Sequence, residues 1–346
     1  MRVLTNVGSR RFQFVGVAFN ASPYANVYPV NSDGTFGTKV ANPATLPTGV
    51  GNSIRWSRGN NDYVAVGMGT TPYVHVYPWT STTTAGGWGA KFANPATLPT
   101  GSVEHTDFNP GNTTIICGHF TSPYFSAYPW SSSGFGTKYA DPASTGITVG
   151  LDVQFSPDGT VVIIGGTAAG GYAYPWSDSS GFGTKYADPV SMPGAVHGLD
   201  WNAQGTLVAV GESLSPYVQV YPWSNSTGWG TAYANPATLP TDTCFMIKFS
   251  QNDQDIINAT NTTPYVNGYQ WSGTGWGTKY GNPVTRPTGT GSGASFSPAN
   301  NNVAFSSTLT PFIFIYPWTI GTGFGTKRAN PATLPGGSAL DAEYTF

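Results

Sequence analysis

The chain is built from one sequence unit that is repeated seven times. The anchor of the unit is Tyr-Pro-Trp or a close variant, and successive anchors lie 46–51 residues apart. Units of about 48 residues account for nearly all of the 346 residues. A period of this length is typical of propellers, solenoids and repeat arrays. The anchor tyrosines are Tyr28, Tyr77, Tyr128, Tyr174, Tyr221, Tyr269 and Tyr316.

Three further motifs keep the same phase as the anchor. A Ser/Thr-Pro-Tyr/Phe turn precedes six of the anchors, and the fourth unit has Gly170-Gly171-Tyr172 instead. A Phe/Trp-Gly-Thr-Lys motif or a close variant follows each anchor, and an Asn-Pro or Asp-Pro dipeptide follows that. Because Asn or Asp before Pro favours extended turns, this dipeptide is expected to open the connection to the next unit.

Each unit is predicted to contain four short strands. In the unit of residues 149–190, the expected strands are 149–156, 160–165, 172–176 and 182–186. Ser156-Pro157-Asp158-Gly159 suits a tight turn, since Pro fixes its own φ and Gly accepts a positive φ. The run 160–165 has no polar face, which indicates a strand that is buried on both sides.

Four strands in each of seven units predict an all-β, seven-bladed β-propeller with four antiparallel strands per blade. A linear solenoid is the competing architecture, but it needs distinct polar capping units, and the first and last units here resemble the others. The composition agrees, because 45 Gly, 28 Pro and only 9 % charged residues do not favour long solvated helices.

The C-terminal strand is expected to close the ring. In most units, the first strand ends in an aromatic residue nine positions after a loop proline, and Tyr344 stands nine positions after Pro335. Residues 339–346 would then supply the innermost strand of the first blade, and residues 1–7 would be a surplus segment. A rival closure places Val7 at that position. Either closure makes residues 1–346 a single domain without a free sheet edge.

The units resemble WD40-type propeller repeats. The resemblance rests on the four-strand pattern, on Phe155-Ser156-Pro157-Asp158-Gly159, and on the Trp that closes the third strand. The Gly-His dipeptide of that family does not recur from unit to unit, and Pro-Trp stands where Trp-Asp would be expected, so the family's buried Asp-His-Ser-Trp network is not carried over. The charge-poor, Ser/Thr/Gly/Asn-rich repeats also resemble repeat proteins of bacteriophage particles.

Charge and hydropathy exclude several classes of partner. A net charge of −2 gives no basic field for nucleic acid. No stretch approaches the roughly 18 apolar residues of a membrane span. Residues 1–14 lack the apolar core of a secretory signal, so a virion or the cytoplasm is the expected location. Cys117 and Cys244 form no spacing motif and are interpreted as buried thiols.

Recognisable catalytic and metal-binding motifs are absent from the sequence. The four histidines, His75, His105, His119 and His197, form no His-Glu-x-x-His motif and have no Cys-x-x-Cys beside them. No Gly-x-Ser-x-Gly motif or Walker loop occurs. The sequence therefore predicts a non-enzymatic protein with no catalytic residue, no metal ion and no cofactor.

Polar residues that differ between units mark the predicted innermost strands. Glu104, His105, Asp152 and His197 lie in these strands, and a further polar series stands just before the terminal aromatic residue. These side chains could line a central channel and bind an ion or a small ligand, or they could form a solvated wall. The series is Arg55, Asp107, Gln154, Asp200, Lys248, Ser295 and Glu343.

Six lysines recur at one position of the predicted outermost strand, where only Ala232 breaks the series. Lysine on an exposed edge prevents pairing with other sheets, which is one interpretation. The other is a positive rim that docks onto an acidic partner protein, and these lysines are the candidate binding residues. They are Lys39, Lys91, Lys138, Lys185, Lys279 and Lys327.

These features predict a structural or interaction propeller that binds other proteins. A bacteriophage virion component is its most specific form, as a capsid decoration, a tail protein or a host-contact protein. The alternative is a lectin-like propeller that binds surface glycans, because Tyr and Trp recur in every unit and are good contact residues for ligands.

Overall fold

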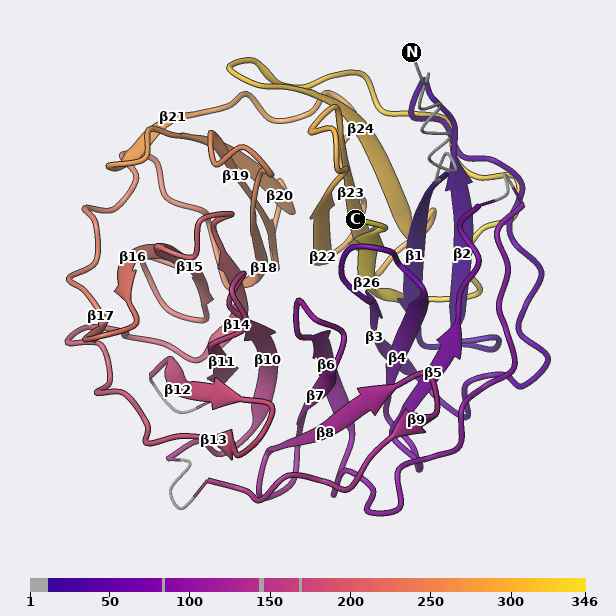
Figure 1. Ribbon diagram of the computed structural model, residues 1–346. Helices are drawn as coiled ribbons and strands as arrows, with labels where there is room; N and C mark the ends of the chain where they lie inside the picture. Colours follow the sequence, from indigo (N-terminus) through magenta and orange to yellow (C-terminus); the bar gives the residue numbers. More distant parts are fainter. Residues whose placement is uncertain (1–11, 83–84, 143–145, 168–169) are drawn as a thin grey trace, which may run out of the picture.

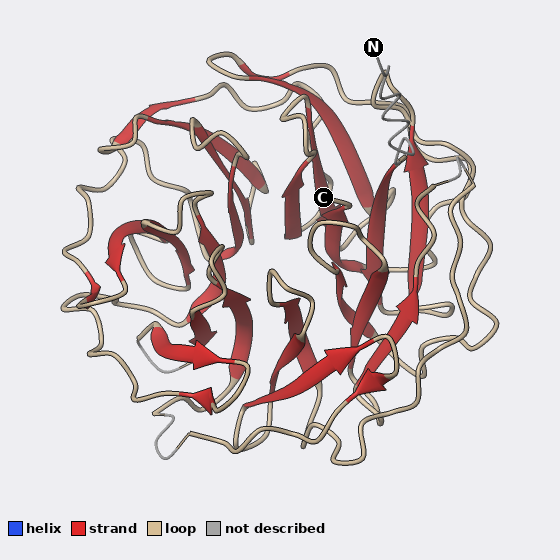
Figure 2. Ribbon diagram, in the orientation of Figure 1, coloured by secondary structure: helices blue, strands red, loops and turns tan. Residues whose placement is uncertain are grey.

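The computed structural model describes residues 12–82, 85–142, 146–167 and 170–346, and the regular elements in this part are all β-strands. Seven antiparallel sheets stand around a central axis (Figures 1 and 2). The predicted seven-bladed propeller is therefore confirmed. Blade 1 combines the last strand of the chain with the first two, blade 2 contains the next three, and blades 3 to 7 contain four consecutive strands each.

The strands repeat in length and position from blade to blade. The innermost strands are β26 (Ala339–Tyr344), β3 (Gly51–Trp56), β6 (Val103–Phe108), β10 (Gly150–Phe155), β14 (Val196–Trp201), β18 (Cys244–Phe249) and β22 (Gly291–Phe296). The second strands are β1 (Gln13–Phe19), β4 (Tyr63–Met68), β7 (Thr114–His119), β11 (Val161–Gly166), β15 (Leu207–Glu212), β19 (Asp255–Thr260) and β23 (Asn302–Ser307). The third strands are β2 (Ala25–Val30), β5 (Val74–Pro78), β8 (Phe125–Ser131), β12 (Tyr172–Ser177), β16 (Val218–Ser224), β20 (Val266–Trp271) and β24 (Ile313–Thr319).

The fourth strand is shorter than the sequence predicts. Residues 182–186 were expected to be a strand, but β13 covers only Gly181–Phe182. In blades 1 and 2 the fourth strand is a single bridge, Val30 to Phe36 and Trp79 to Trp88. The remaining outer strands are β9 (Gly134–Phe135), β17 (Gly228–Trp229), β21 (Trp276–Lys279) and β25 (Gly323–Phe324).

The proline of Tyr-Pro-Trp explains this shortening. Pro175 accepts a hydrogen bond from Gly183 N at 2.8 Å, but proline has no N–H to return, so the ladder stops there. Blade 6 has Gln270 at the same position, and its outer strand β21 is four residues long.

The C-terminal strand closes the ring as expected. β26 pairs with β1 in antiparallel register, with Tyr344 opposite Val15. Thr345 N donates to Phe14 O at 3.0 Å, and Phe346 N donates to Asn61 Oδ1 at 2.9 Å in blade 2. The innermost position of blade 1 is thus occupied by residues 339–344, and Val7 of the rival closure lies outside the described residues. The predicted surplus segment 1–7 lies outside the described residues.

The anchor residues form the core of each blade. Every anchor tyrosine is at most 1 % exposed, and the anchor tryptophan packs edge-on between two other rings. In blade 4, the Trp176 ring lies 5.4 Å from the Phe155 ring on the innermost strand and 4.9 Å from the Phe182 ring on the outermost strand. The recurring aromatic residues are therefore used for packing along each blade. The thiols of Cys117 and Cys244 are buried and free.

Candidate functional site

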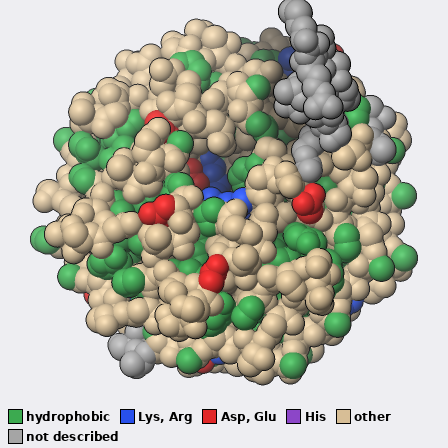
Figure 3. Space-filling view, in the orientation of Figure 1, with side chains coloured by type: hydrophobic (Ala, Val, Ile, Leu, Met, Phe, Trp, Pro, Cys, Tyr) green, Lys and Arg blue, Asp and Glu red, His purple; other side chains and the backbone are tan. Residues whose placement is uncertain are grey.

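Much of the scarce charge of this protein lies on the axis of the propeller. Burying an ionised side chain costs free energy. Because only 9 % of the residues are charged, a cluster of them in the interior is a candidate functional site. The face in Figure 3 has a hollow at its centre that contains both cationic and anionic side chains. The charged residues in or beside the channel are Arg55, Arg58, Glu104, Asp107, Asp152, Asp200, Lys248, Asp341 and Glu343.

The channel has two cavities, one at each end of the innermost strands. We call them the carboxyl-end cavity and the amino-end cavity. The carboxyl-end cavity, of about 340 Å³, is bounded by the residues just before the terminal aromatics, which is the series predicted to line the channel. The amino-end cavity, of about 330 Å³, is bounded by the second residues of the same strands. That ring is Asn52, Glu104, Leu151, His197, Phe245, Ser292 and Leu340.

Many of the channel residues hold neighbouring blades together. Asp107 Oδ2 accepts from Phe155 N at 2.8 Å, and Asp200 Oδ2 accepts from Phe249 N at 2.7 Å, in each case in the next blade. Ser295 Oγ accepts from Tyr344 N at 3.1 Å in the same manner. A second layer repeats the pattern, since Asp152 Oδ2 accepts from Leu199 N at 2.8 Å. These carboxylates therefore have a structural role that the sequence pattern did not reveal.

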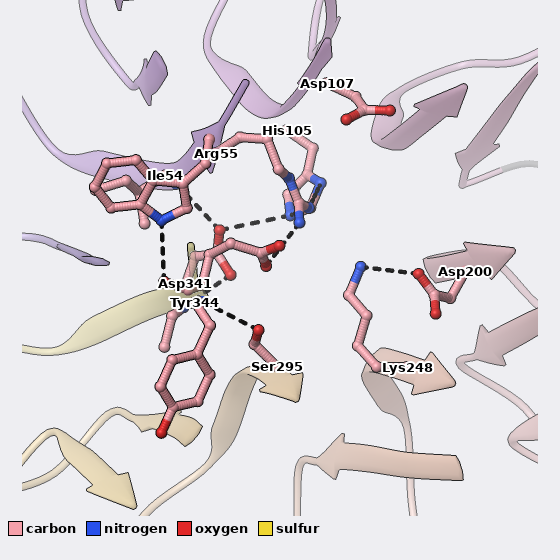
Figure 4. Close-up of polar contacts among 12 residues, drawn as sticks. Ile54, Arg55, His105, Asp107, Asp200, Lys248, Ser295, Asp341 and Tyr344 are labelled. Atoms are coloured by element: carbon pink, nitrogen blue, oxygen red, sulfur yellow. Dashed lines mark hydrogen bonds and ion pairs between the residues drawn. The ribbon is translucent and has the colours of Figure 1, made fainter. Parts of the chain in front are cut away.

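A buried charge network separates the two cavities (Figure 4). Arg55 Nη1 lies 2.7 Å from Glu343 Oε2, and Arg55 Nη2 lies 3.0 Å from His105 Nδ1. His105 Nδ1 is also 2.5 Å from Asp152 Oδ1, and its Nε2 is 3.8 Å from Asp341 Oδ2. Arg55 lines the carboxyl-end cavity and His105 lines the amino-end cavity, so the network is the floor of both.

Opposite charges favour the ionised forms of Arg55 and Asp152 in this network. Burial opposes the charge on Arg55, but the carboxylates around it, Glu343 first among them, outweigh burial and raise its pKa. Burial likewise opposes the charge on Asp152, but the charge and hydrogen bond of His105 outweigh it and lower the pKa of that carboxyl. Burial raises the pKa of Glu343, although Arg55 opposes the change.

The amino-end cavity contains a carboxylate with a free oxygen. Glu104 Oε1 accepts from Asn52 Nδ2 at 3.0 Å and from Ser102 Oγ at 2.8 Å, and no described residue donates to Oε2. Burial raises the pKa of Glu104 to about 6, although the Ser102 hydroxyl opposes the change. Burial also lowers the pKa of His197, so its imidazole is neutral near pH 7. No Lys or Arg is among the described residues that line this cavity.

The carboxyl-end cavity differs because it gathers the cations. Arg55, Arg58 and Lys248 line it together with Asp107, Asp200 and Glu343. Arg58 lies in the turn after β3, and no repeated motif in the sequence pointed to it. Its Nη2 donates to Asp107 Oδ2 at 2.7 Å, and its Nε donates to Phe108 O at 3.1 Å.

The six rim lysines lie far from the channel, on the outer edges of the blades. Each Nζ donates to the Asn or Asp three residues later, as from Lys91 to Asn94 Oδ1 at 2.7 Å and from Lys279 to Asn282 Oδ1 at 3.0 Å. Lys39, Lys138, Lys185 and Lys327 make the same contact. Each lysine thus fastens the outer edge to the Asn-Pro or Asp-Pro turn, and docking of a partner on this rim stays a prediction.

No set of three or more His, Cys, Asp or Glu side chains in the described part is arranged to hold a metal ion. The same part of the chain contains no helix that is long and apolar enough to span a membrane.

Comparisons with known proteins identify the fold but no family. No family model matches the chain, and no curated protein matches it, so its resemblance to WD40 repeats rests on the repeat pattern alone. Among solved structures, a protein of Bacteroides fragilis named as a candidate 6-phosphogluconolactonase matches with a TM-score of 0.75 and 9 % identity, over 98 % of this chain and 99 % of its own. The periplasmic gluconolactonase of Pseudomonas aeruginosa matches with a TM-score of 0.71 and 12 % identity, over 96 % of this chain and 99 % of its own.

A protein of Lactobacillus plantarum matches with a TM-score of 0.71 and 10 % identity, over 97 % of this chain and all of its own. At such low identities, the comparisons establish that the chain shares this propeller fold.

The prediction of a non-enzymatic virion propeller, with its lectin-like alternative, is wrong. Two of the structural neighbours are named as lactonases, so this fold also occurs in proteins that are named as hydrolytic enzymes. The prediction relied on the absence of local catalytic motifs. In a propeller, the residues that meet on the axis come from different blades, so a site on this fold leaves no local motif in the sequence.

Proposed function

We propose that the protein is a hydrolase of small, polar lactones and that Glu104 is its general base. The observation that carries the proposal is a half-buried carboxylate with a free oxygen at a cavity on the propeller axis. A general base is most effective when its pKa is close to the working pH, and burial raises the pKa of Glu104 to about 6.

The reaction needs one water molecule and no other reagent. Glu104 Oε2 accepts a proton from the water while the water oxygen bonds to the lactone carbonyl carbon. The ring C–O bond then breaks, and the proton passes to the departing ring oxygen, which leaves a hydroxy acid. Ser292 and Thr308 line the same cavity and supply hydroxyl donors for the carbonyl oxygen.

The cavity walls suit a small ring with polar substituents. Leu151, Phe245, Met246 and Leu340 give apolar surface, and the Glu104 carboxylate and the His197 imidazole give polar contacts. A volume of about 330 Å³ lies at the lower end of the range for small-molecule pockets. The two lactonase-named neighbours support the reaction class, since their chains are covered almost completely by the same fold.

The proposal is tested by measuring the release of acid from gluconolactone in a pH-stat, with spontaneous hydrolysis subtracted. Glu104→Gln keeps the shape of the side chain but removes the base, so kcat/KM should fall by roughly a hundredfold or more. Asp33→Asn, a matched carboxylate-to-amide change in an exposed turn, should have no effect.

The pH profile provides a second readout. Because Glu104 must be ionised to act as a base, kcat/KM should rise with pH, reach half of its limiting value near pH 6 and level off at higher pH. A wild-type rate equal to the blank would disprove the proposal. An unchanged rate for Glu104→Gln would remove Glu104 from the mechanism.

A further inference from the structure

We infer that the carboxyl-end cavity is a second ligand site, where Lys248 binds a small molecule that bears a carboxylate or phosphate group. The amino-end cavity with Glu104 is separate from it, because the Arg55–His105 contact lies between the two. The inference concerns different residues from those of the proposed hydrolase site, and it does not depend on the proposed hydrolase activity.

Lys248 is a buried cation that has fewer hydrogen-bond acceptors than its ammonium group can use. The residue is 8 % exposed, and its Nζ makes one contact among the described residues, to Asp200 Oδ1 at 3.3 Å. An ammonium group has three N–H donors, and a buried ion needs partners for them. Lys248 lines the cavity, so its remaining donors face the open space (Figure 4).

The carboxylates around the cavity are already engaged. Asp107 Oδ2 accepts from both Arg58 Nη2 and Phe155 N, and Asp200 Oδ2 accepts from Phe249 N. Glu343 Oε2 is paired with Arg55 Nη1 at 2.7 Å. These carboxylates are held by arginine or backbone partners, whereas Lys248 has a single long contact. An incoming acceptor therefore meets a donor that lacks strong partners.

Arg58 supplies a second, preorganised donor. Its backbone is held by Asn112 of blade 3, because Arg58 N donates to Asn112 Oδ1 at 2.9 Å and Asn112 Nδ2 donates to Arg58 O at 2.7 Å. Its guanidinium contacts the described residues through Nε and Nη2, which leaves Nη1 for a ligand. Arginine and lysine together are a usual pair for carboxylate and phosphate recognition.

The end of the chain does not provide the missing anion. Phe346 borders the cavity, but its backbone oxygen accepts from Asn61 Nδ2 at 2.8 Å. No ion pair joins Lys248 to the terminal carboxylate within the described residues. A volume of about 340 Å³ then limits the ligand to a small molecule.

The experiment is isothermal titration of the full chain at constant ionic strength, with inorganic phosphate in one arm and gluconate in the other. At least one anion should bind saturably, and the arm that binds more tightly identifies the chemical group. Lys248→Met should weaken binding at least tenfold, whereas Lys248→Arg should retain it. Arg286→Gln removes an exposed positive charge elsewhere and should bind as the wild type does.

Two outcomes would overturn the inference: no saturable binding of either anion at millimolar concentration, or wild-type affinity in Lys248→Met. Circular dichroism of Lys248→Met would show whether the variant is folded. If it is not folded, the test uses Lys248→Arg and Arg58→Gln instead. Arg58→Gln must then bind the anion at least tenfold more weakly than the wild type for the inference to hold. Anion binding by a protein that does not hydrolyse lactones would leave the inference intact and disprove only the proposed function.

Discussion

Single side chains hold the long connections of the propeller in place. The hydroxyl of Tyr77 donates to Thr45 O at 2.9 Å, and that of Tyr128 donates to Thr97 O at 2.9 Å. In both cases, the acceptor lies in the Asn-Pro-Ala-Thr-Leu-Pro connection of the preceding unit. The anchor tyrosine therefore fills the blade with its ring and fastens a loop with its hydroxyl.

Glu212 is a buried residue whose carboxyl group has too few hydrogen-bond partners to offset the cost of burying its charge. It ends β15, is fully buried, and accepts only from Gly194 N at 3.1 Å, while its Oε1 has no partner among the described residues. Burial raises the pKa of Glu212 to about 7, above the value of about 4.3 expected in the unfolded chain. The folded state therefore binds the proton more tightly.

Glu212 should make the stability of the protein depend on pH. Its contribution is full below about pH 4 and is lost as the pH rises from about 4 to about 7, with a total loss of at most about 4 kcal/mol. Glu212→Gln cannot ionise, so it should be more stable than the wild type at pH 8 and similar to it at pH 5. Urea unfolding at the two pH values measures this. Equal differences at both values would contradict the prediction.

At the scale of elements, a repeated proline limits the outermost strand. The glycine of Phe/Trp-Gly-Thr-Lys lies directly on this proline, since a Cβ at Gly136 would come within 2.8 Å of Pro129 Cβ. The proline accepts one hydrogen bond from this glycine and returns none, as between Gly230 N and Pro222 O at 2.8 Å. Short, interrupted edge strands also offer little to a neighbouring sheet, which protects against aggregation.

Gln270→Pro should shorten the outer strand of blade 6. The change removes the N–H that this position offers to β21 and makes blade 6 like the others. We expect faster hydrogen exchange at Trp276–Lys279 and a stability loss of about 1 kcal/mol. Exchange in β17 of blade 5, which already follows a proline, is the internal control. Unchanged protection of β21 would show that another feature sets its length.

At the scale of the whole molecule, the ring depends on contacts between its two ends. β26 is the innermost strand of blade 1, and it carries Asp341 and Glu343 into the charge network of the channel. Asp341 Oδ2 accepts from Ile54 N at 3.1 Å, which joins blade 1 to blade 2. One strand therefore completes a sheet, two blade interfaces and the channel wall.

Deletion of residues 339–346 should lower the melting temperature by roughly 10 °C or more, because it removes buried residues and exposes the edge of β1. Deletion of 345–346 alone keeps β26 and should cost much less. Differential scanning calorimetry of both truncated chains checks this prediction. Similar melting temperatures for the wild type and the longer deletion would mean that β26 does not carry the closure.

The repeat architecture could be predicted from the amino-acid sequence alone. Seven in-phase units and the nine-residue spacing from Pro335 to Tyr344 predicted the number of blades and the closing strand. These features are local or strictly periodic, so they can be read from a single chain. The lining of the channel by Arg55, Asp107 and Lys248 was also expected, because equivalent positions of a repeat converge on the axis.

The contacts that those residues make could not be predicted, because they depend on how the blades pack in the folded ring. Arg55 meets Glu343 across the closure of the ring, and Arg58 reaches Asp107 from a turn that no motif marks. Side-chain length and blade geometry determine such pairs, and periodicity carries no information about either. Burial, which is a property of the folded ring, raises the pKa of Glu104 and leaves Lys248 with a single long contact. The candidate chemistry therefore arises where seven separate strands meet.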